Sequence, residues 1–291
     1  MKFFKENAFR AFRAVRSYFS HRGLRKRFVW INKLYKYLNK QISPEIVTVQ
    51  GHKMCLDSQD SLNLAINGVY EPFQTSLVRQ YLKEGNIVLD IGANIGYYTL
   101  IFAQLVGERG KVIAFEPEPY LMNILAKNVE LNGYTNISLV QKAVSNQRGT
   151  ATLQLDEFAN VDHRLYDASP VGTAIQVETI KIDDCFPVEE KTVDFIKMDI
   201  QGSEGRALAG MKGILERNRT LVLITEFWPA RLQGSGTSPK DFIQGLLDSG
   251  FEIRVIDERL RKLSKFATPE EIIEAHSGSE NSQTNLLCVK E

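Results

Sequence analysis

The 291-residue chain is poor in cysteine and has no long apolar run. Its three cysteines, Cys55, Cys185 and Cys288, stand far apart and form no C-x-x-C pair. A disulfide framework and a zinc site are therefore not expected, and a reducing cytoplasm fits. No apolar run reaches the ~18 residues of a membrane span, and the N-terminus lacks the apolar core of a secretion signal. These absences predict a cytoplasmic, globular protein with one large domain and an appendage.

Charge is distributed unevenly along the chain. Residues 1–40 contain twelve Lys and Arg and a single acid, whereas the rest contains 24 bases and 34 acids. At about 100° per residue, residues 4–19 form a helical pattern with Phe4, Phe12 and Phe19 on one face and Arg10 and Arg13 on the other. Such a helix fits a membrane surface, and it equally fits packing on its own body or on a second subunit. We treat residues 1–45 as a basic helical extension.

From Asn86 onward, strand and helix patterns alternate. Helices are expected over 95–106 and 118–133, and residues 149–183 read as extra β segments rather than as a crossover helix. The expected strands are NIVLDI, KVIAFEP, ISLVQKAV, VDFIKMDI, TLVLITEF, FEIRVI and TNLLCVK. Ser238 and Pro239 are expected to cap and open a later helix. Repeated β-α-β units predict an α/β domain over 46–291, with a mostly parallel sheet and helices on both faces.

The stretch VLDIGANIGYYT, Val88 to Thr99, joins a strand to a helix through a loop with a glycine at each end. No Gly-Lys-Ser/Thr follows, so it is not a P-loop, and the spacing Gly92-x-x-x-Gly96 lacks the third glycine of a dinucleotide fingerprint. Glu116, 24 residues after Gly92, can accept hydrogen bonds from a ribose diol. Asp90 would repel a pyrophosphate but could help to hold an ammonium group. The combination favours S-adenosylmethionine over the plainer interpretation of a tight turn and a solvated strand end.

Eight sequence blocks then resemble one known family. GVYEP, VLDIGANIGYYTL, VIAFEPEP, NVELNG, KAVSNQRG, KIDD, FIKMDIQGSEGRAL and LITEFWP occur in the order found in FkbM-type methyltransferases, from about residue 67 to the last strand. The resemblance implies the Rossmann-like, seven-stranded fold of S-adenosylmethionine-dependent methyltransferases. It also implies O-methyl transfer, commonly to a hydroxyl of a sugar or of a glycosylated or polyketide product. Residues 1–45 lie outside the resemblance.

The resemblance also implies roles for individual positions. The residues implied to surround the methionine part of the cofactor are Asp90, Gly92, Asn94 and Gly96. The resemblance further implies that Glu116 binds the ribose and that Ala143 lies near the adenine. It implies that Glu71 closes over the cofactor. Two positions depart from the common pattern. Asn94 replaces a glycine common in methyltransferases at large, and Gln201 stands in DIQG where the family usually reads D-V-E-G. If that glutamate is catalytic, activity is in doubt; if it lines the pocket, Gln201 alters substrate choice.

Methyl transfer requires alignment of oxygen, carbon and sulfur, and a base or a metal can remove the hydroxyl proton. Asp199 ends the fourth strand, Glu226 ends the fifth, and His163 lies in the extra segment between strands three and four. These three are the candidate bases, and Asp162 and Gln201 are candidate acceptor contacts. The alternative interpretations are that His163 has a structural role and that Asp199 and Glu226 are solvated strand ends. Mg²⁺ held by Asp199, Glu226 and Asp162 is considered but not favoured.

The sequence thus predicts an S-adenosylmethionine-dependent O-methyltransferase acting on a glycan or another hydroxylated metabolite. One rival is a tRNA or rRNA methyltransferase that uses the basic arm, although no Asn/Asp-Pro-Pro-aromatic motif follows the fourth strand. The other rival is a non-catalytic module that binds the cofactor, for which Gln201 is the one favourable feature. Residues 1–20 are a candidate contact with an anionic membrane, which would place the protein at the inner membrane face. Nucleic acid is not favoured as a partner, and the oligomeric state stays open.

Overall fold

The structure, a computed structural model, describes residues 46–291 except 59, 156–163, 167–171, 187–192, 267, 280 and 281. The expected helical extension and two candidate site residues, Asp162 and His163, lie outside the described residues. The chain divides into two compact units, 1–70 and 71–291. In the first unit, β1 (Val47–Val49) pairs antiparallel with β2 (His52–Met54), and α3 (Leu64–Asn67) follows. The expected boundary after residue 45 stays a prediction.

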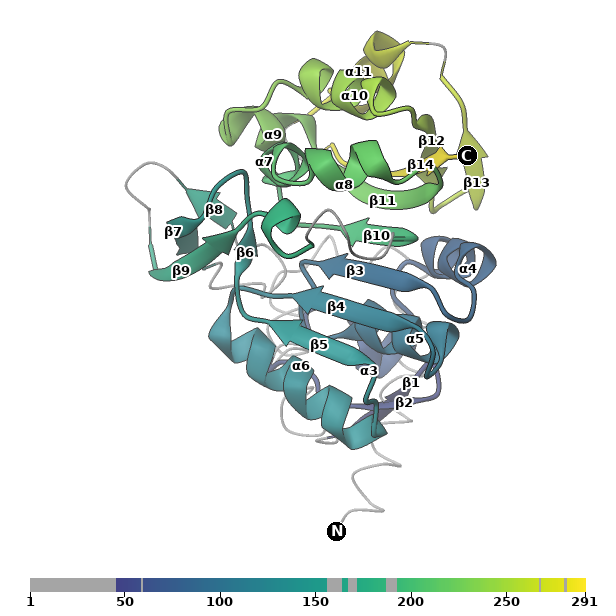
Figure 1. Ribbon diagram of the computed structural model, residues 1–291, viewed down its shortest axis with the longest axis vertical. Helices are drawn as coiled ribbons and strands as arrows, with labels where there is room; N and C mark the ends of the chain where they lie inside the picture. The colour runs from purple at the N-terminus through teal and green to yellow at the C-terminus, as the bar shows by residue number, and fades with distance from the viewer. Residues whose placement is uncertain are drawn as a thin grey trace, which may run out of the picture. The chain divides into compact units, whose positions relative to one another are not determined.

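The second unit is built on an eight-stranded sheet with the order β13-β12-β14-β11-β10-β3-β4-β5, shown in Figure 1. Its parallel strands are β3 (Ile87–Ile91), β4 (Lys111–Phe115), β5 (Ile137–Val140), β10 (Phe195–Met198) and β11 (Leu221–Phe227). Strand β14 (Thr284–Lys290) runs antiparallel between β11 and β12 (Glu252–Asp257). The mostly parallel sheet is confirmed. It has one strand more than expected, because a hairpin after β12 adds the short edge strand β13 (Lys262–Ser264).

The central strands are buried on both faces, which explains their continuous runs of aliphatic residues. Val88, Leu89 and Ile196 are 0% exposed. Two charged residues interrupt these runs: Asp90 on β3 and Lys197 on β10 are register partners on neighbouring strands. A buried acid and a buried base placed side by side reduce the electrostatic cost that either would carry alone.

Helices connect most of the strands. They are α4 (Pro72–Tyr81), α5 (Tyr97–Val106), α6 (Pro119–Asn132), α7 (Glu204–Ala209), α8 (Lys212–Arg217), α9 (Pro229–Gly234), α10 (Pro239–Asp248) and α11 (Pro269–His276). Helix α5 begins two residues later than expected, because Asn94 and Gly96 have positive φ angles that a helix cannot contain. The expected cap of α10 is confirmed: Ser238 Oγ accepts a hydrogen bond from the Asp241 amide, and Pro239 follows it.

A second, four-stranded sheet replaces a helical crossover between β5 and β10, as the sequence predicted. Its order is β6-β9-β7-β8, with β6 (Ala143–Val144), β7 (Gly149–Gln154), β8 (Arg164–Tyr166) and β9 (Ala174–Ile180). A short 3-10 turn, η2 (Ile182–Asp184), leads on towards β10. Figure 1 shows this small sheet beside the ends of β3, β4 and β5. Within the described residues, no helix is long and apolar enough to cross a membrane.

Candidate active site

The glycine loop, residues 92–96, leaves β3 and opens α5. Its backbone curves back on itself, with φ angles of 80° at Gly92, 52° at Asn94 and 92° at Gly96. The amides of Gly92 and Ala93 both donate to the carbonyl of Phe115 on β4, at 3.0 and 2.9 Å. A Cβ at position 96 would lie 2.5 Å from Leu125 Cδ1, so this close approach to α6 requires a glycine. The loop is therefore shaped by backbone contacts.

Asp90 lies behind the glycine loop and is fully buried. One of its carboxylate oxygens, Oδ2, accepts a 2.5 Å hydrogen bond from Thr99 Oγ1. The other, Oδ1, has no hydrogen-bond partner in the part of the chain that the structure describes. Burial raises the pKa of Asp90, while the neighbouring Lys197 ammonium and the Thr99 hydroxyl lower it. Asp90 thus anchors the start of α5, and its free oxygen leaves one acceptor site at the base of the loop.

Glu116 ends β4 and is 5% exposed. Its Oε2 accepts from the Asn94 amide at 2.8 Å and its Oε1 from the Glu118 amide at 3.0 Å. Each carboxylate oxygen has a second lone pair, so the group can still accept two ligand hydroxyls. Burial raises the pKa of Glu116 to about 7, against the lowering effect of the two backbone hydrogen bonds. The sequence predicted the position of this carboxylate but not its contact with the glycine loop.

The DIQG loop, residues 199–202, follows β10 and lies directly against the glycine loop. A Cβ at Gly92 would overlap the Asp199 carbonyl oxygen, so the two backbones touch. Buried Glu204 holds the loop by accepting from the amides of Ile200 and Gly202, each at 2.9 Å. Burial raises the pKa of Glu204 to about 7. Glu204 is a site residue that the sequence analysis did not identify.

Lys197 is the central base of the site, and its side chain is only 7% exposed. Its Nζ lies 3.3 Å from Asp199 Oδ2 and 5.3 Å from the centre of the Tyr98 ring. Burial lowers the pKa of Lys197, but the carboxylates of Asp199, Asp90 and Glu71 together raise it above its usual value. The ammonium group therefore stays charged and offsets these acids. A lysine inside the apolar run of a central strand was the sequence signal for this role, and it was missed.

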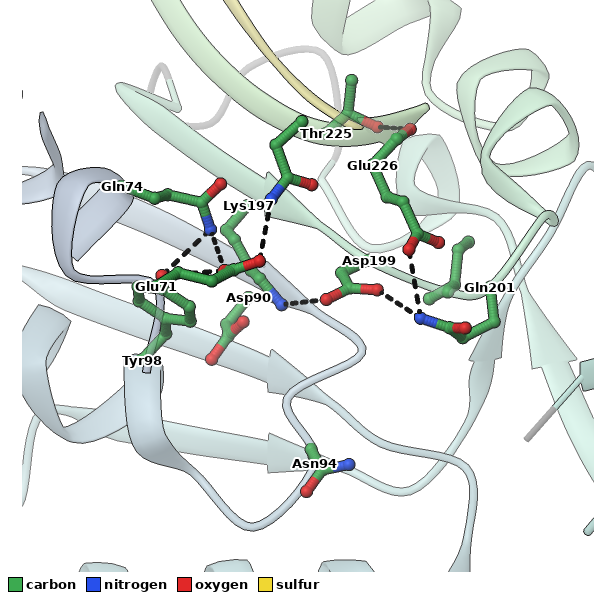
Figure 2. A network of polar contacts seen from close by, with 12 residues as sticks. Glu71, Gln74, Asp90, Asn94, Tyr98, Lys197, Asp199, Gln201, Thr225 and Glu226 are labelled. Carbon is green, nitrogen blue, oxygen red and sulfur yellow. Dashed lines mark hydrogen bonds and ion pairs between the residues drawn. The ribbon is translucent and has the colours of Figure 1, made fainter. Parts of the chain in front are cut away.

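Gln201 connects three charged side chains, as Figure 2 shows in part. Its Nε2 lies 2.9 Å from Asp199 Oδ1 and 3.4 Å from Glu226 Oε1. Its Oε1 accepts a hydrogen bond from the Arg231 guanidinium, which also stacks on the ring of Trp228 at 3.3 Å from Cζ to the ring centre. Asp199 consequently has a donor on each carboxylate oxygen: Lys197 on one and Gln201 on the other.

Glu226 is the penultimate residue of β11 and is 6% exposed. Burial raises its pKa well above the usual range, and the Asp199 and Glu204 carboxylates raise it further. Its Oε2 is buried and has no hydrogen-bond partner among the described residues. Glu226 is thus an acid that favours its neutral form, which makes it a poorer candidate for a general base than the partly exposed Asp199.

Glu71 begins α4 in a left-handed conformation, with a φ of 43°. Its Oε2 accepts from Gln74 Nε2 at 2.6 Å and from the Tyr98 hydroxyl at 3.1 Å, and its Oε1 accepts from Asn285 Nδ2 on β14 at 2.8 Å. Burial raises the pKa of Glu71 to about 7, and the Asp199 carboxylate contributes to the rise. Figure 2 shows Glu71 on the Lys197 side of the network, opposite Glu226.

An open cavity lies between the two loops and is lined by residues of both. Among its lining residues are six that the sequence had selected: Gly92, Asn94, Glu116, Ala143, Asp199 and Gln201. Its remaining wall is largely apolar and includes Leu153 and Leu165 from the small sheet. Such a cavity combines an apolar wall for an adenine, a carboxylate for a ribose and a glycine loop for the methionine part. The residues therefore fit S-adenosylmethionine.

Four further predicted residues that the structure describes are absent from the lining of this cavity: Glu71, Asp90, Gly96 and Glu226. Gly96 supports the glycine loop, Asp90 is buried behind it, and Glu71 and Glu226 flank Asp199. Among the described residues, no group of three or more His, Cys, Asp or Glu is arranged to hold a metal ion. Asp162, the third proposed ligand, lies outside that part of the chain.

Comparison with known proteins gives a consistent result. The Methyltransferase FkbM domain matches residues 90–262. The chain is 30% identical over 145 residues to a protein-L-isoaspartate O-methyltransferase of Methanococcus aeolicus, across 45% of this chain and 64% of that protein, which is less than two thirds of its length. It is 26% identical over 222 residues to the 2-O-methyltransferase NoeI of Sinorhizobium fredii, across 69% of this chain and 88% of that protein. A solved FkbM methyltransferase of Methylobacillus flagellatus aligns at 17% identity with a TM-score of 0.42, covering 79% of this chain and 53% of that one.

Proposed function

Because the chain belongs to the FkbM methyltransferase family and is an S-adenosylmethionine-dependent methyltransferase, we propose that it methylates a hydroxyl of a sugar, a glycan or another hydroxylated metabolite. The single observation that carries the proposal is the position of Asp199. Asp199 lines the cavity beside the glycine loop, and each oxygen of its carboxylate has one donor. A carboxylate held in this way can accept a hydroxyl proton while a methyl group is transferred to the oxygen.

The bound S-adenosylmethionine supplies an electrophilic methyl group on a sulfonium. The chain holds it through three groups of different chemistry. The backbone of the glycine loop would surround the methionine part, Glu116 would accept from the ribose hydroxyls, and Ala143 would lie against the adenine. Asp199 would orient the acceptor hydroxyl and take its proton as the C–O bond forms and the methyl–sulfur bond breaks, which leaves S-adenosylhomocysteine. These residues act mainly by alignment, which accounts for a large part of the rate in reactions of two bound molecules.

The charges of the site favour a hydroxyl over an anionic acceptor. Four carboxyl groups surround the point of transfer: Glu71, Asp90, Asp199 and Glu226. Of the bases near the cavity, Lys197 and Arg231 contact Asp199 and Gln201 respectively, and Lys142, which lines the cavity, pairs with Glu178. The carboxylate of an isoaspartyl residue or the phosphates of RNA would therefore meet the Asp199 carboxylate and bases that are already engaged. These groups favour a neutral hydroxyl over the acceptors of the isoaspartate relatives and of the rival RNA methyltransferase.

An acceptor panel tests the proposal. The full chain is incubated with methyl-labelled S-adenosylmethionine and, in parallel, with methyl glycosides of common hexoses, an isoaspartyl peptide and bulk tRNA. We expect label in a base-stable methyl ether of a glycoside. Base-labile label in the peptide would show that the acceptor is a carboxyl group rather than a hydroxyl. Label in tRNA would support the rival RNA methyltransferase. Tight binding of S-adenosylhomocysteine without any turnover would support the non-catalytic module.

We also propose that residues 1–20 bring the enzyme to an anionic membrane surface. The support is the sequence: aromatic residues such as Phe4 and Phe12 share one helical face, and Arg10 and Arg13 share the other. Each Lys or Arg near an anionic surface contributes about 1 kcal/mol, and the apolar face adds to this. The remainder of the chain, with its excess of acids, would be repelled. A lipid-linked or cell-envelope glycan at the inner membrane face would then be within reach.

Vesicle co-sedimentation tests the membrane proposal. The full chain is expected to bind vesicles with anionic lipids and to lose binding at high salt, because screening weakens the contribution of the arginines. Deletion of residues 1–20 should remove vesicle binding while leaving the affinity for S-adenosylhomocysteine unchanged. If the deletion instead splits a dimer or unfolds the protein, and the full chain ignores vesicles, then the segment is a packing element.

A further inference from the structure

The side-chain amide of Gln201 has only one workable orientation. Its Nε2 faces two carboxyl groups, Asp199 Oδ1 and Glu226 Oε1, and its Oε1 faces the guanidinium of Arg231. Rotating the amide by half a turn would place an oxygen against two acceptors and an NH₂ group against a donor. Asp199 and Arg231 therefore fix the amide of Gln201 so that its Nε2 faces the carboxyl groups of Asp199 and Glu226. A glutamate in this position could supply that donor only when it carries a proton.

Two glycines place Gln201 between rigid neighbours. On one side, Gly92 allows the glycine loop to touch the carbonyl of Asp199, and on the other, Gly202 allows the backbone to pass Arg231. A Cβ at Gly202 would lie 2.6 Å from Arg231 Cβ. Gln201 itself has a φ of 57°, a conformation that costs energy for a residue with a side chain. The packing that maintains it also holds the amide against Asp199.

We propose that Gln201 is a positioning residue for methyl transfer: its amide directs the Asp199 carboxylate into the cavity and ties it to Glu226, in an orientation set by Arg231. The inference rests on the proposed function, in which Asp199 takes the proton of the acceptor. Lys197 holds Oδ2 of Asp199 and Gln201 holds Oδ1, so removal of Gln201 frees one half of the carboxylate. Where the family usually has a glutamate, Gln201 thus gives Asp199 a hydrogen-bond donor that does not depend on protonation.

The charged groups around Gln201 determine how a glutamate would behave there. Asp199, Glu226 and Glu204 are acids, and Arg231 and Lys197 are bases. An ionised glutamate at this position would pair with Arg231 but repel the Asp199 carboxylate, whereas a protonated one could donate to Asp199 in place of the amide. The substitution Gln201→Glu should therefore be active at low pH and lose activity, relative to the wild type, as the pH rises.

Steady-state kinetics of the full chain test the proposal, with the methyl glycoside that the wild type methylates fastest. Gln201→Ala should lower kcat by about 10- to 100-fold, the scale of misplacing a reacting group, with little change in KM for S-adenosylmethionine. Gln201→Glu should lower kcat by a factor that grows with pH. The matched control is Gln244→Ala on α10, which removes an exposed amide that contacts Asp248 and should change neither constant. A Gln201→Ala enzyme with wild-type kcat would overturn the proposal, as would a Gln201→Glu enzyme whose activity relative to the wild type is independent of pH.

A second measurement needs no acceptor. In the crystal structure of Gln201→Ala with S-adenosylhomocysteine, the Asp199 carboxylate should turn away from the cavity, towards Lys197. If it keeps its position, the inference is wrong even where glycosides are methylated. If it turns away but the wild type methylates no glycoside, then the positioning role holds and the proposed acceptor is wrong.

Discussion

The glycine loop is held mainly through its own backbone amides, one of which donates to the Glu116 side chain, whereas the DIQG loop is also held through its own side chains, Asp199 and Gln201. In the first, the Gly92 and Ala93 amides donate to the Phe115 carbonyl. In the second, Glu204 accepts from two amides, and Gln201 joins Asp199 to Glu226. The two loops touch at Gly92 and line the same cavity. The difference suits their tasks, since an unchanging cofactor needs a fixed shape and proton transfer needs charged groups that can be tuned.

The largest effect is expected where the loops meet. Gly92→Ala would force a Cβ into the Asp199 carbonyl oxygen, at a φ of +80° that disfavours alanine. Moving either loop backbone would cost free energy. We therefore expect the affinity for S-adenosylhomocysteine to fall by more than about 100-fold and the protein to be destabilised by about 1–3 kcal/mol. Calorimetry and thermal unfolding measure both. Gly133→Ala, which has a φ of +67° and nothing within 4 Å, is the matched control and should cost only the backbone strain.

The next largest effect separates chemistry from binding. Asp199→Asn keeps the size of the side chain but removes the base, so kcat should fall by about 100-fold or more. Affinity for S-adenosylhomocysteine, measured by calorimetry, should stay nearly constant. Exposed Asp248→Asn serves as the control for the same chemical change elsewhere. Equal kcat in Asp199→Asn and wild type would transfer the role of the base to Glu226 or to His163.

A smaller effect belongs to the cofactor side. The pKa of Glu116 is raised to about 7, chiefly by burial, and only the ionised form can accept from both ribose hydroxyls. Binding stabilises the charged form, so affinity for S-adenosylhomocysteine should rise as the pH increases through about 7. Glu116→Gln should weaken binding by about 1–3 kcal/mol and remove this pH dependence. Titrations about one pH unit either side of 7 decide the point, because an unchanged pH dependence in the variant would exclude Glu116 as its source.

The smallest effect lies outside both loops. Glu258, in the turn after β12, accepts from the amides of Phe73 and Gln74 at the start of α4, at 3.0 and 2.6 Å. Glu258→Ala removes this cap and should destabilise the protein by about 0.5–2 kcal/mol, or a few degrees in Tm. Affinity for S-adenosylhomocysteine should change little. A large loss of affinity would mean that α4 takes part in closing the cofactor site.

The sequence could bring Gly92 and Glu116 together at one cavity because the signals for these residues are local. Gly92, Gly96 and Glu116 follow strand ends within one β-α-β unit, so spacing alone places them together. The acidic side depends on residues that only the sheet brings together. Lys197 pairs in register with Asp90 across more than a hundred residues, and Glu71 meets Asn285 on the last strand. No local pattern reports such contacts, although a lysine inside an apolar strand was a usable signal.

The topology itself was predicted in part. Alternating patterns predicted the parallel strands and the extra β segments, because each element has its own period. The edge strand β13 was missed because its three residues, Lys262 to Ser264, carry no alternation of their own. The short helix α9, which carries Arg231, was missed for another reason. Its position depends on the absence of a side chain at Gly202, which a sequence pattern does not distinguish from an ordinary turn.

The position of β14 has a consequence for how the protein is made. This strand follows all the other strands of the sheet in sequence, yet it lies between β11 and β12, which do not pair with each other. Until residues 284–290 leave the ribosome, the growing sheet is in two pieces, each with an open edge. Asn285 on the same strand also supplies the partner of Glu71. The emerging polypeptide therefore completes this part of its acidic network only once the last strand has been synthesised.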